Sequence, residues 1–181
     1  MVREWALDRP PGADAELRSW RWSATGSKPS MIVFLAPERA LVTSGDGALF
    51  IFDMDQRRVD LRELGSHQAS VNSVLVTNDD RILTSSYDGT VAIWDAAHCR
   101  NLAVHRAHTG SIEQVSVSAD RLMSRSYDGI LKITSVESGA LICAFQGDKQ
   151  FISCAADAGM KGIAALDQSG QMHFFRVEGD A

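Results

Sequence analysis

The sequence predicts an all-β fold built from four copies of one unit, each about 41 residues long. A tight-turn glycine followed by an apolar run recurs at spacings of 42, 40 and 41 residues, at Gly47, Gly89, Gly129 and Gly170. Each of these glycines lies between segments rich in apolar and β-branched residues, which favour strands. No segment sustains the period of an amphipathic helix. Repetition at this period is typical of stacked β units.

Each unit can be divided into four strands, as the second unit shows. Asp88-Gly89 between two apolar segments predicts a hairpin, because a tight turn needs positive φ. One further strand is expected upstream, at 71–76, and another downstream, at 102–105. Four strands in about 41 residues is the period of a β-propeller blade. We therefore predict a preceding strand and linker over 1–16 and a propeller segment over 17–181, with units near 23–62, 63–105, 106–146 and 147–178.

The second unit also contains a specific motif, formed by Gly65-Ser66-His67, Ser85-Ser86-Tyr87-Asp88-Gly89-Thr90 and Ile93-Trp94-Asp95. This motif resembles the WD-repeat family. The resemblance implies a hydrogen-bonded tetrad of His67, Thr84 or Ser86, Asp88 and Trp94. Such a tetrad is chemically reasonable, since a buried carboxylate, imidazole and indole N–H all need partners.

The other units keep less of this motif. The third has His108, Ser124 or Ser126, and Asp128, but Thr134 stands where Trp is expected. The first has Asp46 with Phe52 at the Trp position and no matching His. The fourth has Ser169 in place of the Asp and Phe175 in place of the Trp. We expect one complete tetrad and one partial tetrad.

The last forty residues also resemble the closing repeat of the WD-repeat tails of bacterial NACHT or NB-ARC signalling ATPases. The resemblance rests on Cys143–Asp148, Ile152–Ala155 and Ser169–Phe174. It implies a sensor module, with the ATPase upstream in such proteins. The phosphate-binding motif GxxxxGK[ST] is absent from this sequence. A C-terminal fragment of a signalling ATPase is therefore kept as an alternative reading.

The fourth unit ends after its third strand, near Arg176-Val177, and residues 17–22 are expected to complete it. Residues 2–7 would then be spare, and they resemble the third strand of a preceding blade. Two architectures follow: a half-ring that pairs with a second copy into an eight-bladed propeller, or a closed four-bladed ring. We favour the half-ring and hence a homo-oligomer, because exposed strand edges and apolar blade faces must be covered.

The family resemblance implies a protein-binding surface on the face that carries the hairpin turns. The corresponding positions are Ser70, Asn72 and Tyr87 in the second unit, and Ser111, Glu113 and Tyr127 in the third. Tyr87 and Tyr127 are the only two tyrosines. They occupy equivalent positions, and tyrosine is enriched at binding hot spots. The alternative is that both tyrosines only cap their hairpins.

Other functional classes are disfavoured. No catalytic motif, cofactor motif or repeated carboxylate set is present, so we expect no enzyme. His98, Cys99, His105 and His108 lack the spacing of a metal site. A net charge of −5 disfavours nucleic acid and anionic membrane, and no apolar run is long enough to span a bilayer. Three scattered cysteines and the lack of a signal peptide predict a cytoplasmic protein.

Overall fold

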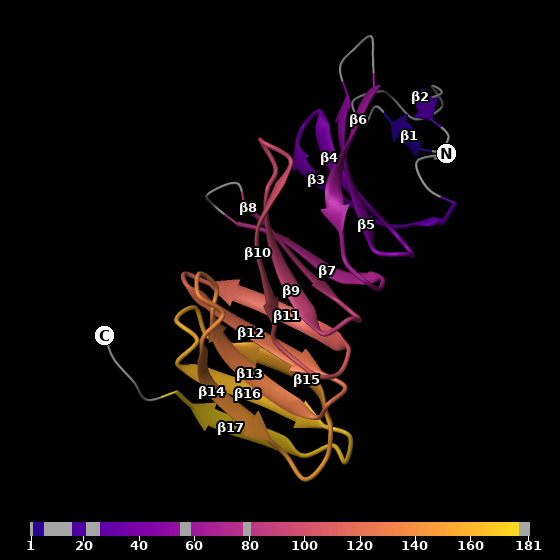
Figure 1. The fold of residues 1–181 in the computed structure, drawn as a ribbon. Helices are drawn as coiled ribbons and strands as arrows, with labels where there is room; N and C mark the ends of the chain where they lie inside the picture. Colours follow the sequence, from indigo (N-terminus) through magenta and orange to yellow (C-terminus); the bar gives the residue numbers. More distant parts are fainter. Residues whose placement is uncertain (1, 6–15, 21–25, 55–58, 78–80, 178–181) are drawn as a thin grey trace.

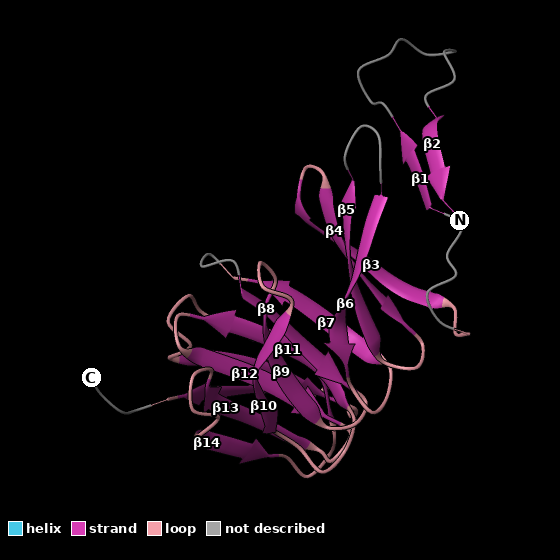
Figure 2. Ribbon diagram, turned by 45° about the horizontal axis from the view of Figure 1, so that its top comes forward, coloured by secondary structure: helices cyan, strands magenta, loops and turns pink. Residues whose placement is uncertain are grey.

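A computed structural model describes residues 2–5, 16–20, 26–54, 59–77 and 81–177. In this part of the chain every regular element is a strand, and the strands form antiparallel sheets (Figure 2). The predicted all-β fold is confirmed. Among the described residues no helix is long and apolar enough to cross a membrane.

Three sheets have four strands each, in which consecutive strands are neighbours. The first contains β3 (Pro29–Ala36), β4 (Arg39–Ser44), β5 (Ala48–Met54) and β6 (Val59–Ser66). The second contains β7 (Val71–Val76), β8 (Arg81–Ser86), β9 (Thr90–Asp95) and β10 (Arg100–Arg106). The third contains β11 (Ile112–Ser118), β12 (Arg121–Ser126), β13 (Ile130–Ser135) and β14 (Leu141–Gln146). We call these sheets blades 1, 2 and 3.

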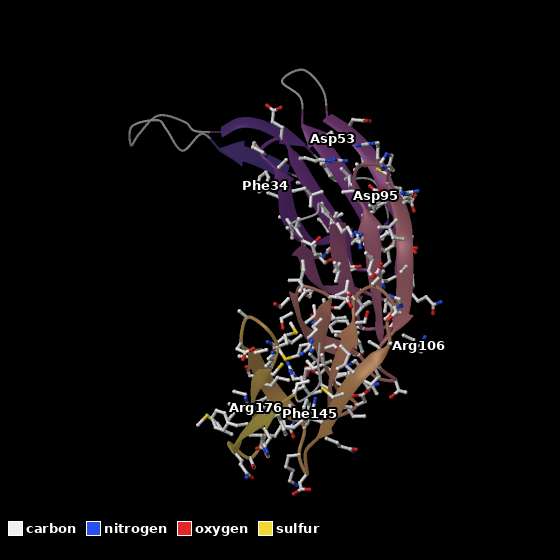
Figure 3. All side chains as sticks on the ribbon, turned by 90° about the vertical axis from the view of Figure 1, so that its left-hand side faces the viewer. Phe34, Asp53, Asp95, Arg106, Phe145 and Arg176 are labelled. Atoms are coloured by element: carbon white, nitrogen blue, oxygen red, sulfur yellow. The ribbon has the colours of Figure 1, made fainter. Side chains whose placement is uncertain are left out.

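Blade 4 has three described strands, β15 (Phe151–Ala156), β16 (Gly162–Asp167) and β17 (Met172–Arg176). Figure 1 shows the four blades as a curved stack, with blades 1 and 4 at opposite ends. Figure 3 shows the same arc from the side, with Phe34 in blade 1 and Arg176 in blade 4 far apart. The first and last blades therefore do not meet within this chain.

The blades are held together by apolar side chains that alternate along each strand. Leu41, Ile51 and Val71 belong to one buried cluster between blades 1 and 2. Equivalent clusters fill the other two interfaces: one contains Leu83, Ile112 and Leu122, and the other Met123, Ile133, Phe151 and Cys154. Each inner blade thus buries both faces, as a repeat architecture requires.

The four marker glycines adopt positive φ in the hairpin turns, with φ from 82° at Gly129 to 95° at Gly47. At Gly89 a Cβ would lie 2.5 Å from the carbonyl oxygen of His108 in the loop entering the next blade. Glycine is therefore required there both by backbone conformation and by close approach.

The N-terminal strands differ from one expectation. Residues 17–22 were expected to complete blade 4, but β2 (Glu16–Trp20) pairs antiparallel with β1 (Val2–Trp5), with Val2 opposite Trp20. Figure 1 places this hairpin beside blade 1, at the far end of the arc from β17. The local pairing of β2 with β1 replaces the predicted long-range pairing, and none of the described strands pairs with the outer edge of β17.

Candidate protein-interaction surface

Blade 2 contains a chain of polar side chains that joins its strands. Trp94 Nε1 donates to Thr84 Oγ1 at 2.7 Å, and His67 Nε2 lies 2.6 Å from the same oxygen. His67 Nδ1 lies 2.9 Å from Thr90 Oγ1 and 3.4 Å from Asp88 Oδ2. Because the Thr84 hydroxyl accepts from the indole, its proton is available to His67 Nε2, and Nδ1–H then faces the Thr90 hydroxyl and the Asp88 carboxylate. Of the two hydroxyls considered, Thr84 thus completes the tetrad.

Asp88 also holds the hairpin turn and the loop that enters the blade. It accepts hydrogen bonds from the Thr90 N–H at 2.8 Å, the Thr90 hydroxyl at 2.6 Å and the Gln68 N–H at 2.9 Å. Burial alone would raise its pKa, but these hydrogen bonds keep the pKa below its ordinary value. Burial lowers the pKa of His67 against the opposing effect of Asp88, so the imidazole stays neutral. Ser86 has a separate role, accepting from the Asp88 N–H at 3.1 Å.

Blade 3 repeats this arrangement without the indole. His108 Nδ1 lies 3.0 Å from Asp128 Oδ2, and His108 Nε2 lies 2.9 Å from the Ser124 hydroxyl. Thr134 is buried at the Trp position. Ser126 caps the turn by accepting from the Asp128 N–H at 3.2 Å. Burial lowers the pKa of His108, as it does that of His67.

The outer blades use shorter polar networks. In blade 1 the exposed Asp46 accepts from the Ser44 hydroxyl and, at 3.4 Å, from the Ala48 N–H. In blade 4 Asp167 accepts from the Ser169 hydroxyl at 2.6 Å and from His173 Nε2 at 2.8 Å. Sequence reasoning missed Asp167 and His173. The signal was present, since Ser-x-Asp in the other turns becomes Asp167-Gln168-Ser169 with the two residue types exchanged.

These networks position the loops that carry the six predicted binding residues. The Tyr87 N–H donates to the Ser70 carbonyl at 3.1 Å, and the Tyr127 N–H donates to the Ser111 carbonyl at 3.0 Å. The two tyrosine side chains are 47% and 62% exposed. The Ser111 hydroxyl donates to the Tyr87 carbonyl at 2.9 Å, which joins the two blades.

The remaining two predicted residues, Asn72 and Glu113, are also part of this surface. The Asn72 amide donates to the Glu113 carbonyl oxygen at 2.6 Å across the interface between blades 2 and 3. The Glu113 carboxylate pairs with Arg125 and accepts from the Tyr127 hydroxyl, an interaction that raises the pKa of Tyr127. The structure thus places all six residues on one continuous, hydrogen-bonded surface.

Blade 4 extends this surface through residues that the sequence did not indicate. Arg125 donates at 2.9 Å to the carbonyl oxygen of Phe151, the first residue of β15. Gln150 lies 3.5 Å from the Glu113 carboxylate, and the Gln168 amide donates to Gln150 Oε1 at 2.9 Å. Arg125 occupies the strand position that Ser85 has in blade 2. Because the residue type at this position differs between blades, no repeated sequence motif indicates the contact that Arg125 makes with blade 4.

The histidines and the cysteine considered as metal ligands have separate partners. His98 lies 2.8 Å from Asp95, and His105 lies 3.2 Å from the Val136 carbonyl oxygen. Cys99 lies 3.8 Å from the Ala96 carbonyl oxygen, and His108 belongs to blade 3's network. No group of three metal-binding side chains occurs among the residues that the structure describes.

Comparisons with known proteins agree with this geometry. The family model "WD domain, G-beta repeat" matches residues 58–95, which include most of blade 2. WD repeat-containing protein 55 of Mus musculus is 28% identical over 109 residues, covering 59% of this chain and 28% of that protein. These matches support a WD-repeat propeller family for this chain. The family assignment made from the blade 2 motif is confirmed.

Two further WD-repeat relatives cover other shares of the chain. Apoptotic protease-activating factor 1 of Rattus norvegicus is 27% identical over 161 residues, 86% of this chain and 13% of that protein. Its similarity agrees with the resemblance to signalling sensor tails. Nuclear distribution protein nudF of Emericella nidulans is 33% identical over 111 residues, 59% of this chain and 25% of that protein. The WD-repeat chain thus spans a minor part of each relative.

Two designed proteins share the fold of this WD-repeat chain. The computationally designed Ika4 protein superimposes with a TM-score of 0.70 at 16% identity, covering 87% of this chain and 96% of that one. The designed Ika8 protein gives a TM-score of 0.73 at 17% identity, covering 92% of this chain and 50% of that one. The same arc therefore forms almost all of one chain and half of another.

Proposed function

We propose that this WD-repeat segment is a non-catalytic scaffold or sensor module that binds a protein partner through the surface of Ser70, Asn72, Tyr87, Ser111, Glu113 and Tyr127. The observation that carries the proposal is the pair of exposed tyrosines, held by equivalent backbone hydrogen bonds on neighbouring blades. Rigid aromatic side chains supply contact area at low entropic cost. WD-repeat relatives support this class of function.

The test replaces both tyrosines by alanine in the full chain. Affinity enrichment from the source cell, quantified by mass spectrometry, should lose proteins that the native chain retains. Val104→Ala on β10 is the control, because Val104 is 56% exposed but lies on an outer strand. Circular dichroism establishes that all three proteins are folded. Equal enrichment by the native chain and the double variant would contradict this surface.

We also propose that two copies of the arc pair end to end. The end face of blade 4 that points away from blade 3 exposes Met172 and Phe174 to 66% and 76%, and an open hollow of about 680 Å³ lies beside Phe174. At the other end Ile32 and Phe34 are 53% and 66% exposed. Apolar faces of this kind pack together between the inner blades, so the two ends suit one another.

Light scattering behind a sizing column tests the pairing, since one chain weighs 19.7 kDa. We expect about twice this mass for the native chain and for Ile142→Asp on β14. Phe174→Asp should give the mass of one chain, because it places a charge on the end face. Ile142 is 44% exposed away from the ends, which makes it a suitable control. A monomeric native chain at all concentrations would exclude the pairing.

The proposed location is the cytoplasm. Cys99, Cys143 and Cys154 are all free thiols, which is typical of a reducing compartment. Burial raises the pKa of Cys154 to about 11, so this thiol is poorly reactive. Imaging of a tagged full-length protein tests the location.

A further inference from the structure

The N-terminal hairpin has the topology of half a blade. In blades 1 to 3 the last strand pairs with the strand before it and then leads into the first strand of the next blade. β2 has the same place, because it pairs with β1 and precedes β3. β1 and β2 therefore correspond to the third and fourth strands of a blade that would precede blade 1.

Blade 1 presents a continuous apolar face to this hairpin. Ile32, Val42 and Phe50 are aligned across β3, β4 and β5, as are Phe34, Ala40 and Phe52. These side chains point away from blade 2, whose contacts are made by Leu41, Leu49 and Ile51. Figures 1 and 3 both place β1 and β2 on this outer side of blade 1.

The face is covered unevenly. Val42 and Ala40 are at most 2% exposed, and Phe50 and Phe52 are both 7% exposed. On β3, the first strand of the blade, Ile32 and Phe34 remain more than half exposed. Part of this face is thus buried within the chain, whereas the part on β3 is exposed.

The described strands of blade 4 leave room for the kind of strand that the hairpin contains. These strands correspond to the first three of a blade, and no described strand pairs with the outer edge of β17, where a fourth strand pairs in blades 1 to 3. When two arcs pair end to end, β2 of one copy lies where β17 of the other needs its fourth strand. β1 occupies the position on β2 that β17 would take.

We propose that β1 competes with β17 of a second copy for the edge of β2. The inference rests on the end-to-end pairing proposed above. In the single chain β1 pairs with β2 over four residues, whereas β17 offers five. The two pairings therefore form similar numbers of backbone hydrogen bonds. Small differences in free energy between them then decide which strand pairs with β2. Displacement of β1 lets β2 complete blade 4 of the partner while remaining joined to its own β3.

Deletion of residues 1–8 tests this competition. Sedimentation equilibrium should show a dimer dissociation constant at least tenfold lower for the shortened chain than for the full chain. In a symmetric pair each copy displaces its own β1, so the free-energy cost of displacement enters the dimer dissociation constant twice. If the full chain dimerises and the deletion leaves its dissociation constant unchanged or weakens it, β1 does not compete, although the pairing stands. If neither chain dimerises, both proposals fail.

A disulfide that locks the hairpin gives the opposite perturbation. Arg3 and Ser19 are Cα partners across β1 and β2, and partners in an antiparallel pair lie within the Cα separation that a disulfide spans. In a variant with Arg3→Cys and Ser19→Cys, the oxidised form should dimerise at least tenfold more weakly than the same protein after reduction. Cys99→Ser and Cys143→Ser are included to prevent other disulfides. Equal dissociation constants before and after reduction, with the disulfide verified by mass spectrometry, would overturn the proposal.

Discussion

Asp88→Ala should destabilise the protein far more than Asp46→Ala, although both residues occupy the same position in their hairpin turns. The Asp88 side chain is 9% exposed and receives three hydrogen bonds of 2.6–2.9 Å in addition to its contact with His67. A hydrogen bond to a charged group contributes about 1.5–3 kcal/mol, and losses within one network are less than additive. We therefore expect the free energy of unfolding to fall by about 3 kcal/mol for Asp88→Ala.

Asp46 is exposed and accepts from the Ser44 hydroxyl and, at a long 3.4 Å, from a backbone N–H. Water replaces these partners easily, so the loss should be much smaller. Urea denaturation followed by tryptophan fluorescence and circular dichroism measures both variants, at one fixed protein concentration because self-association would shift the midpoint. Equal losses for the two variants would refute the assignment of a buried tetrad to blade 2 alone.

Three other perturbations test separate parts of the structure. Because burial lowers the pKa values of His67 and His108, their neutral forms stabilise the fold above the ordinary histidine pKa of about 6.5. This stabilisation should be lost as pH falls from about 6.5 through the folded-state pKa values. In a His67→Gln, His108→Gln variant the urea midpoint should therefore depend less on pH over this range. The same pH dependence in the variant and the native chain would contradict neutral imidazoles. Arg125→Met should lower the free energy of unfolding by about 2–4 kcal/mol, because Glu113 loses its cationic partner and the Phe151 carbonyl oxygen loses the guanidinium donor. Glu113→Gln in the same chain should recover part of the loss, and strict additivity in a double-mutant cycle would argue against the ion pair. Finally, Asp167→Ala should lower Tm more than Ser169→Ala, since Asp167 accepts from both Ser169 and His173; the reverse order would show that the turn of blade 4 depends on Ser169.

The repeat and its strands could be predicted because every blade has the same local structural requirements. A glycine with positive φ, a hydrogen-bonding residue beside it and alternating apolar residues are all needed within about 41 residues, so they recur visibly. The tetrad partners were equally predictable where the residue types matched the family motif. The choice between Thr84 and Ser86 required the structure, because both hydroxyls are buried and only their orientation distinguishes them.

Contacts between blades were less predictable. Arg125 and Ser85 occupy equivalent strand positions, but Arg125 reaches a carbonyl oxygen in blade 4, whereas Ser85 is too short for such a contact. The pairing of β2 was missed for a similar reason. The sequence of β2 suits the outer edge of any blade, and nothing in it specifies whether β1 or β17 is the partner. Such pairings depend on which strand is nearby and at what effective concentration.

Polar contacts join the inner blades, whereas exposed apolar side chains mark the two ends of the arc. Between blades 3 and 4, Gln114 exchanges hydrogen bonds with the backbone of Cys154, and Arg125 donates to the Phe151 carbonyl oxygen. Asn72 makes the corresponding tie between blades 2 and 3. These contacts fix the register of the inner blades, while Phe34 and Phe174 at the two ends are exposed apolar side chains. In the end-to-end pairing proposed above, these exposed apolar ends supply contact area without polar ties of known register. The proposed strand exchange at β2, more than the blade cores, should therefore control assembly.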